Sequence, residues 1–338
     1  MTRTTPPRPV DITAAFPELA AMARTTTRLH PRPGSPSVSD SSVGGPLLWP
    51  ADEPWPMCDE WHGGYGRMTL DDVHTRRRIL TAAWRRPRAP HADLLTPDER
   101  QIIDRASAGC HPGSKRPSGP VPLIPVAQLY ARDIPGLACP EGTDTLQVLW
   151  CPFDHGDDYA PAVRLRWRRA ADVTAVLTDP PVPELVGSDN YVPAPCVLHP
   201  EQVVEYPAGD DLPDDLRERV YAWEDEQESG CGFYQSDLSV APGWKTGGWA
   251  AWWTFTDPAV WPLRCPCGAV AEPLVTIDSG EWDGGTHSWR PAEDVDPPDG
   301  VHYPSPNCPT MVTIGRGYTL QVYRCGESYE HPPMTVMQ

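Results

Sequence analysis

The residues of this 338-residue chain whose types and spacing could do chemistry are mainly its cysteines and histidines. Two short segments share a C-x₃-H spacing, Cys58-Asp-Glu-Trp-His62 and Cys151-Pro-Phe-Asp-His155. Together they supply two thiolates and two imidazoles, a set that suits tetrahedral zinc. The alternative is that both cysteines are small buried apolar groups and both histidines lie at the surface. The spacing therefore predicts one zinc site, made by Cys58, His62, Cys151 and His155.

A second set of cysteines lies in the C-terminal part of the chain. Cys265-Pro-Cys267-Gly has a turn-like sequence, Cys308 follows in a long loop, and Cys325 ends a strand-like segment. Four thiolates fit a structural zinc site, although C-x-C is a less common spacing than C-x₂-C. The sequence predicts zinc bound by Cys265, Cys267, Cys308 and Cys325, with His331 or His302 as possible replacements for one thiolate.

A third candidate is the segment from Ile277 to Trp289, which contains Glu281, Asp283 and His287 between tryptophans. These three side chains could act as acid and base groups or as ligands, flanked by aromatic rings as in carbohydrate sites. The alternative is a glycine-rich turn with charged tips, which the Gly and Asp content favours. The chain contains no nucleophile elbow, phosphate-binding loop or dinucleotide fingerprint.

Four short landmarks occur twice in the same order, and they indicate how the chain is built. They are Gly-Gly at 44 and 247, Trp-Pro at 55 and 261, Pro-Leu-aliphatic at 122 and 273, and Thr-Leu-Gln-Val at 145 and 319. Unequal distances between the copies indicate unequal insertions. The recurrence predicts an internal duplication of two β-rich units that share one core.

The landmarks divide the chain into predicted regions. These are a partly flexible N-terminal lead (1–40), a first β-rich repeat (41–170), a connecting segment (171–243) and a second β-rich repeat (244–338) with the cysteine-rich candidate. A helical insertion is predicted at 69–108 within the first repeat, where Thr96-Pro-Asp-Glu99 forms a capping box. The fold class predicted is α+β, with antiparallel sheets.

The clearest strands are Thr145–Cys151, Val163–Arg168 with its strict alternation, and Thr319–Cys325. The segment Val121–Tyr130 is also apolar, but prolines interrupt it. Because proline cannot donate a hydrogen bond to a neighbouring strand, we expect this segment near the edge of a sheet.

The Gly-Gly and Trp-Pro opening, the strand Pro122-Leu-Ile-Pro-Val-Ala-Gln128 and the strand Leu146-Gln-Val148 together resemble the YwqG-like domains of unknown function. The resemblance covers about residues 40–335. It implies an α+β protein with antiparallel sheets and an internal duplication, and it carries no established catalytic residues. Some members of that family look like neighbours of toxin systems, and the resemblance therefore implies an immunity role for this chain.

Composition restricts the partners and the compartment. The formal net charge is −18, which disfavours binding to nucleic acid or to an anionic membrane and favours a basic protein partner. The N-terminal residues lack an apolar leader, and no run of 18 apolar residues occurs, so we expect no membrane span and a cytoplasmic protein. Cysteines in a reducing cytosol bind metal or lie buried more often than they form disulfides.

These observations favour a non-enzymatic cytosolic binding protein, of an immunity type, in which zinc serves the structure. The alternative is a hydrolase or carbohydrate-processing enzyme that uses Glu281, Asp283 and His287. A cavity lined by those three residues would favour the enzyme. A broad acidic or apolar surface without such a cavity would favour the binding protein.

Overall fold

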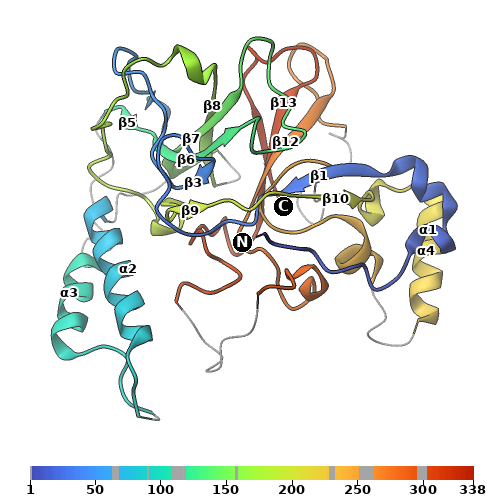
Figure 1. Cartoon of the computed structure of the whole chain (residues 1–338), viewed down its shortest axis with the longest axis horizontal. Helices are drawn as coiled ribbons and strands as arrows, with labels where there is room; N and C mark the ends of the chain where they lie inside the picture. The colour runs from blue at the N-terminus through green and yellow to red at the C-terminus, as the bar shows by residue number, and fades with distance from the viewer. Residues whose placement is uncertain are drawn as a thin grey trace.

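The protein is a mixed α+β structure built mainly from antiparallel sheets, as the sequence predicts. The computed structural model describes residues 2–62, 68–89, 91–107, 117, 119–156, 159–227, 233–250, 262–294 and 303–338. Within these ranges the strands form two six-stranded sheets and one short pair, β4 with β5. What we call the first sheet has the order β2-β9-β3-β6-β7-β8, and the second sheet has the order β10-β1-β11-β12-β13-β14. Figure 1 shows the two sheets next to each other, with helices at both ends of the molecule.

The strands of the first sheet are β2 (Arg32–Pro33), β3 (Ser42–Val43), β6 (Ile124–Tyr130), β7 (Thr145–His155), β8 (Ala160–Arg168) and β9 (Cys196–Val197). Those of the second are β1 (Arg24–Arg28), β10 (Glu201–Glu205), β11 (Lys245–Gly247), β12 (Ala271–Asp278), β13 (Thr319–Cys325) and β14 (Met334–Met337). The short pair is β4 (Met57–Cys58) with β5 (Val121–Pro122). The helices are α1 (Ile12–Ala15), α2 (Leu70–Arg85), α3 (Pro97–Ser107) and α4 (Asp214–Glu226).

The strands predicted at 145, 163 and 319 are confirmed as β7, β8 and β13, and β7 and β13 lie at the heart of the two sheets. Successive side chains of a strand point to opposite faces. On β7, Val148 and Trp150 pack into the largest apolar core, to which β13 contributes Leu320 and Val322. The two sheets therefore share one core. The opposite face of β7 buries Cys151 in a smaller cluster that contains Trp49 and Trp55.

Prolines interrupt both β6 and β12, yet neither strand lies at an edge. The expectation of an edge position for the segment 121–130 is wrong, because β6 pairs with both β3 and β7. The register of β6 shifts between Pro125 and Ala127, and that of β12 shifts between Pro273 and Val275. A bulge of this kind accommodates a residue that cannot join the ladder. The pairing makes Pro125, rather than Pro122, the counterpart of Pro273.

The first strand of the chain belongs to the sheet built from its last strands. β1 lies between β10 and β11 in the second sheet, although a partly flexible lead was expected up to residue 40. In return β9, from the middle of the chain, lies between β2 and β3 in the first sheet. Each sheet thus needs a strand from the other half of the sequence, so the predicted regions are intertwined.

The two exchanged strands occupy matching places. β1 leads into Leu29-His-Pro31 and then β2, while β9 leads into Leu198-His-Pro200 and then β10. In the first sheet β9 pairs with β3, which ends just before the Gly-Gly pair at 44. In the second sheet β1 pairs with β11, which ends at the first glycine of the pair at 247. The repeated tripeptide is a sequence signal that the landmark analysis missed. The common ancestry of the two halves stays a prediction.

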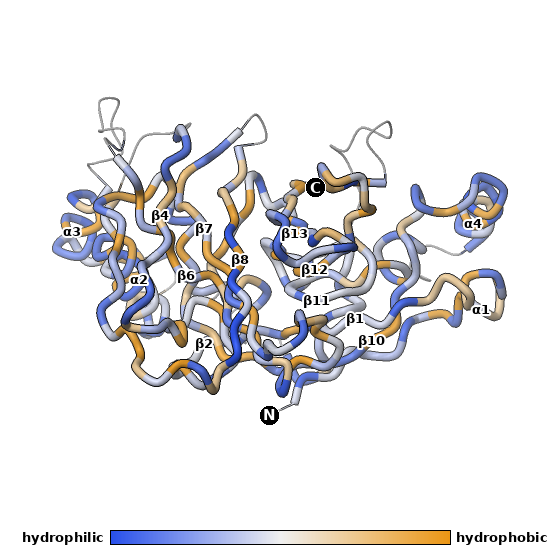
Figure 2. The backbone as a smooth tube through the Cα atoms, turned by 90° about the horizontal axis from the view of Figure 1, so that it is seen from above, coloured by the Kyte–Doolittle hydropathy of each residue, from blue (hydrophilic) through white to orange (hydrophobic). Residues whose placement is uncertain are grey.

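Helices cover the ends of the molecule rather than the sheet faces. α2 and α3 pack on each other at one end, where Thr69 and Thr96 form the capping boxes. α4 packs with α1 at the other end, through Leu216 and Val220. Figure 2 shows the hydrophilic outer side of α4 turned away from the sheets. No helix in the described part of the chain combines the length and apolar character that a membrane span requires.

The two Gly-Gly turns give a prediction on stability. Gly44 has a φ of +63°, and a Cβ there would lie 2.7 Å from the Ala194 carbonyl oxygen. Gly247 has a φ of +67°, but its Cβ would be 3.9 Å from the Thr25 carbonyl oxygen. We expect Gly247→Ala to cost about 1–2 kcal/mol through backbone strain alone. Gly44→Ala should cost more, because a backbone atom must also move.

Urea unfolding of both variants checks this order, with Gly119→Ala as the control. Gly119 has open space around its Cβ position, and its φ lies outside the left-handed range. Its substitution should change the free energy of unfolding by less than about 0.5 kcal/mol. Equal losses for Gly44→Ala and Gly247→Ala would contradict the predicted steric difference.

Candidate metal centres

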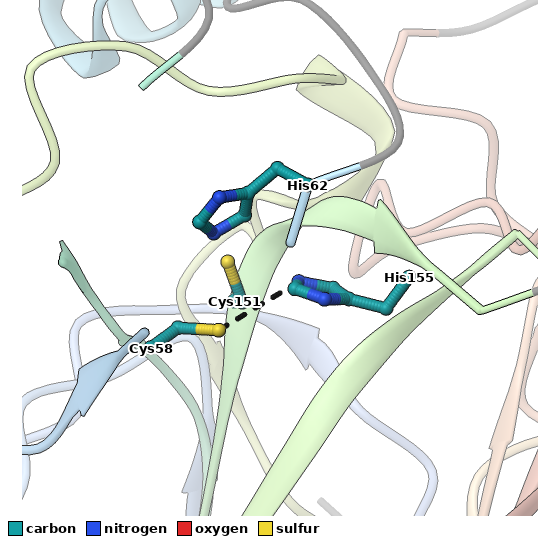
Figure 3. A group of neighbouring side chains, drawn as sticks. All are labelled: Cys58, His62, Cys151 and His155. Atoms are coloured by element: carbon teal, nitrogen blue, oxygen red, sulfur yellow. Dashed lines mark hydrogen bonds between the residues drawn. The ribbon is translucent and has the colours of Figure 1, made fainter. Parts of the chain in front are cut away.

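The structure brings together Cys58, His62, Cys151 and His155, as the sequence predicts. One ligand atom from each lies within 4.8 Å of all the others, and all four residues are buried. Cys58 lies on β4, His62 follows four residues later, and β7 contributes both Cys151 and His155. Figure 3 shows the four side chains converging on one space. We call this group the first centre.

The nitrogen atoms of the first centre are arranged for ligation. His155 Nε2 lies 3.8 Å from Cys58 Sγ, while His155 Nδ1 lies 3.8 Å from a carboxylate oxygen of Glu60. Metal-binding histidines commonly direct their second nitrogen toward a carboxylate, which fixes the ring orientation. His62 Nε2 is buried without a hydrogen-bond partner among the described residues. A buried polar atom without a partner is costly, and a bound metal ion would provide one.

The two thiols of the first centre act on each other. The hydrogen bond from Cys151, together with His155, lowers the pKa of Cys58 to about 3. The same bond and burial raise the pKa of Cys151. One thiolate is therefore favoured even in the protein alone, and a divalent cation would favour the second.

A second group of four ligands lies at the corresponding end of the second sheet. It consists of Cys265, Cys267, Cys325 and His331, whose ligand atoms also lie within 4.8 Å of one another. His331 Nδ1 is 3.3 Å from Cys325 Sγ and 3.4 Å from Cys265 Sγ. The sulfur atoms of Cys267 and Cys325 are 3.5 Å apart. We call this group the second centre.

Tight turns set the positions of these sulfur atoms. The Gly268 amide donates to the Cys265 carbonyl at 2.8 Å, and a φ of +93° at Gly268 makes this turn possible. After β13 the Glu327 amide donates to Cys325 Sγ at 3.4 Å. Burial alone would raise the pKa of Cys325, but this bond and that with His331 lower it to about 6.

One predicted ligand of the second centre is corrected. Cys308 is not part of the group, and its Sγ donates to the Val312 carbonyl at 3.4 Å. Its loop instead runs beside β9 and the residues before it: Cys196 Sγ donates to the Pro309 carbonyl, and the Ala194 amide donates to the Thr310 carbonyl at 2.7 Å. Burial raises the pKa of the Cys308 thiol to about 11. His331, the alternative ligand in the sequence analysis, has the fourth position, and His302 lies outside the described residues.

The two centres have matching positions in their sheets. Cys151 and Cys325 each lie six residues after the first threonine of the Thr-Leu-Gln-Val strand; β13 ends at Cys325, whereas β7 continues to His155. Cys58 pairs with Val121, and the Cys265 amide donates to the Ala269 carbonyl in the corresponding short hairpin. The remaining two ligands differ, since the first centre has two histidines where the second has Cys267 and His331.

The third sequence candidate does not form one site. Glu281 is 1% exposed, and its carboxylate accepts from the Trp244 amide and lies 3.6 Å from His30 Nδ1. Asp283 is exposed and accepts from the amide and hydroxyl of Thr286, while His287 is exposed in a short 3₁₀ turn. Glu281 thus points into the interior and the other two side chains lie at the surface.

No protein-family model matches the chain, and no curated protein sequence is similar enough to count as a relative. The resemblance to the YwqG-like domains therefore stays a prediction.

The ligand sets determine what a bound metal could do. Cys₂His₂ and Cys₃His are sets that hold zinc in closed tetrahedral sites. Four protein ligands leave no position for water or substrate, whereas catalytic zinc keeps one open. Each centre would instead tie the short antiparallel pairing at Cys58 or beside Cys265 to the Thr-Leu-Gln-Val strand of its sheet.

The separation of Cys308 from the second centre gives a prediction on zinc content. Protein purified without a metal-affinity tag should contain two zinc ions per chain, one for each centre. The double variant Cys58→Ser/Cys151→Ser should lose one, and Cys265→Ser/Cys325→Ser should lose the other. Elemental analysis by mass spectrometry measures both losses.

The matched control is Cys139→Ser/Cys308→Ser, which removes two thiols that lie outside both centres. We expect it to retain both zinc ions. A loss of zinc in this control would restore Cys308 as a ligand, and zinc-free wild-type protein would exclude both centres.

Proposed function

We propose that this is a non-enzymatic binding protein whose two centres hold structural zinc. The observation that carries the proposal is the pair of closed four-ligand sets, one at the corresponding end of each sheet. Cys58 ends the two-residue strand β4 and His155 ends β7, with Pro56 just before β4 and Pro152 where the register between β7 and β8 shifts. Zinc would supply there the cross-link that hydrogen bonds cannot.

We propose further that the partner is a basic protein and that it binds the outer side of α4. Asp214, Asp215, Glu218, Asp225 and Glu226 are all exposed there. Tyr221 adds an aromatic ring that is 40% exposed. Aromatic residues are common at the centres of protein interfaces, and a dense negative charge accelerates association with a positive partner. An immunity role, which the YwqG-like resemblance implies, is compatible with such a surface.

The acidic residues at 281, 293 and 294 contribute little to this surface. Glu281 is buried against His30. Asp294 forms ion pairs with Arg3 and Arg32, and Glu293 accepts hydrogen bonds from Thr4. Glu293 and Asp294 thus fasten residues 3 and 4, and β2 of the first sheet, to the segment 293–294. Residues 295–302 lie outside the described part of the chain.

The hydrolase alternative requires Glu281, Asp283 and His287 to act together, and their separation gives it no support. Turnover of a sugar or ester substrate that Glu281→Gln abolishes would nevertheless revive it, provided that the variant keeps the melting temperature of the wild type. The stability check matters because Glu281 is part of a buried ion network.

We also propose that the two sheets descend from one duplicated unit, with α2 and α3 as the helical insertion of the first copy. The matching strand orders, the two proline bulges and the paired Leu-His-Pro segments support this proposal. The matching positions of the two centres would then date from before the divergence of the copies.

A structural role for zinc predicts a loss of stability on chelation. Removal of both ions should lower the melting temperature by about 10 °C or more, because zinc binding is coupled to folding and each kcal/mol shifts the melting temperature by roughly 2–4 °C. Added zinc should restore it, whereas magnesium should not. An unchanged melting temperature after complete zinc removal would refute the structural role.

The role of α4 is tested by neutralising part of its acidic side. Asp215→Asn, Glu218→Gln and Asp225→Asn together should slow association with a basic partner isolated at low salt by at least about threefold, and weaken the salt dependence. The control is Asp93→Asn, Asp98→Asn and Asp104→Asn, an equal charge change around α3. Equal rates for the two triple variants would show that α4 is not the binding surface.

A further inference from the structure

A cavity on the outer face of the second sheet has features of a ligand site, and it is separate from both metal centres. Its volume is about 360 Å³. It lies on the face of β12 and β13 opposite the shared core, since Thr276, Asp278 and Thr319 line it while Ile277 and Leu320 are core residues. The segments around Val240 and Trp282 form its other walls.

Two carboxylates line the cavity, and neither belongs to an ion pair among the described residues. Asp278 and Asp283 both line it. The Asp278 carboxylate accepts hydrogen bonds from the amides of Gly243 at 2.9 Å and Gly280 at 3.3 Å. Asp283 accepts from the amide and the hydroxyl of Thr286. Neither carboxylate forms an ion pair with a basic group in the described part of the protein.

The rest of the lining is aromatic or apolar. Trp282 and Tyr318 provide two rings, and Val240, Ala241 and Pro242 provide an apolar wall. Such a lining binds the hydrocarbon part of a ligand, while one or two charged groups fix its orientation. The two features together specify a molecule with a positive end and an apolar body.

We propose that this cavity binds a small organic cation, a primary amine or guanidinium attached to an apolar group, with the cationic end at Asp278. Charge-assisted hydrogen bonds to a carboxylate are about twice as strong as neutral ones. The aromatic rings contribute through cation–π attraction and through contact with the apolar body. The site is independent of zinc, so it stands or falls separately from the structural role of the two centres.

The electrostatics of Asp278 agree with this assignment. Burial raises the pKa of Asp278 to about 6, and the nearby charge of Glu281 adds to the effect. The ionised carboxylate is therefore held at a cost in the protein alone. A bound cation would remove part of that cost, which is a source of affinity that a neutral ligand lacks.

The test compares two probes of nearly identical shape, phenethylamine and 2-phenylethanol, on the full-length zinc-loaded protein at pH 7.5. We expect calorimetry to detect the amine and to find the alcohol at least about tenfold weaker, since a hydrogen bond to a charged group contributes about 1.5–3 kcal/mol. Asp278→Asn should weaken the amine by a similar factor. Asp93→Asn, which removes an exposed charge elsewhere, should not change its affinity.

A second variant covers the case in which Asp278→Asn fails to fold. Gly285 lines the cavity at the surface, its φ lies outside the left-handed range, and a Cβ there would meet only the Asp283 carboxylate at 3.4 Å. Gly285→Trp should therefore fold normally and fill the entrance, abolishing amine binding. Equal affinities for amine and alcohol, or no binding of the amine at millimolar concentration, would overturn the proposal. So would unchanged amine affinity in a folded Asp278→Asn or Gly285→Trp variant.

Discussion

The buried guanidinium of Arg28 is the interaction on which the second sheet depends. A charge in the protein interior costs several kcal/mol unless hydrogen bonds and opposite charges compensate it. Arg28 is fully buried, and it donates to the hydroxyl of Thr5 and to the carbonyls of Glu281 and Trp289. Burial lowers the pKa of Arg28, and the carboxylate of Glu281 opposes that shift. Arg28 lies on β1, the strand that the N-terminal part of the chain adds to the second sheet. Through this one side chain, β1 holds both the N-terminal segment and the loop after β12.

The first sheet has the same strand pairing, but its described residues place no charged side chain where Arg28 lies in the second sheet. Val197 occupies in β9 the place that Arg28 has in β1, and Ser42 occupies the place of Lys245, which is paired with buried Glu205. Its outer face is held instead by side-chain amides, as Gln147 Nε2 donates to Gln128 Oε1 at 2.9 Å. Gln147 Oε1 accepts in turn from Arg168 Nε, and Arg168 pairs with Glu53. In the second sheet, by contrast, the carboxylate of Asp278 lines the cavity. The chemistry of the two sheets differs although their pairing does not.

The sequence was informative wherever a local pattern decides the structure. Alternation and apolar runs located β7, β8 and β13, and cysteine spacing located seven of the eight ligands, with His331 named only as an alternative. Local patterns failed where the partner is distant in sequence. Nothing near Arg28 shows that β1 pairs with β11, because that register depends on residues more than 200 positions away. The prediction of Cys308 as a ligand failed for the same reason: its loop packs beside β9, more than 100 positions away in the sequence, and not beside the other cysteines.

Proline was the other source of error, and it has a physical explanation. A proline favours an edge position, because it lacks the amide that an inner strand must offer. At Pro125 and Pro273 the structure places a bulge instead, which lets the strand keep both neighbours with a shift of register. The repeated Leu-His-Pro segments are a better indication of the strand order than proline, because each one directly follows a strand that joins the sheet of the other half.

The two centres differ in what they would hold together. All ligands of the first centre belong to β4, β7 and the turn after β4, so a metal there joins elements around the first sheet only. The loop of the second centre also reaches the first sheet, because the ring of Tyr329 packs edge-on against Trp167 of β8 at a centroid distance of 5.3 Å. A metal bound by Cys325 and His331 would fix that loop on either side of Tyr329. A metal in the second centre would therefore order a contact between the two sheets. Loss of that metal would disturb the packing of both sheets, whereas loss of a metal from the first centre would disturb only the first sheet.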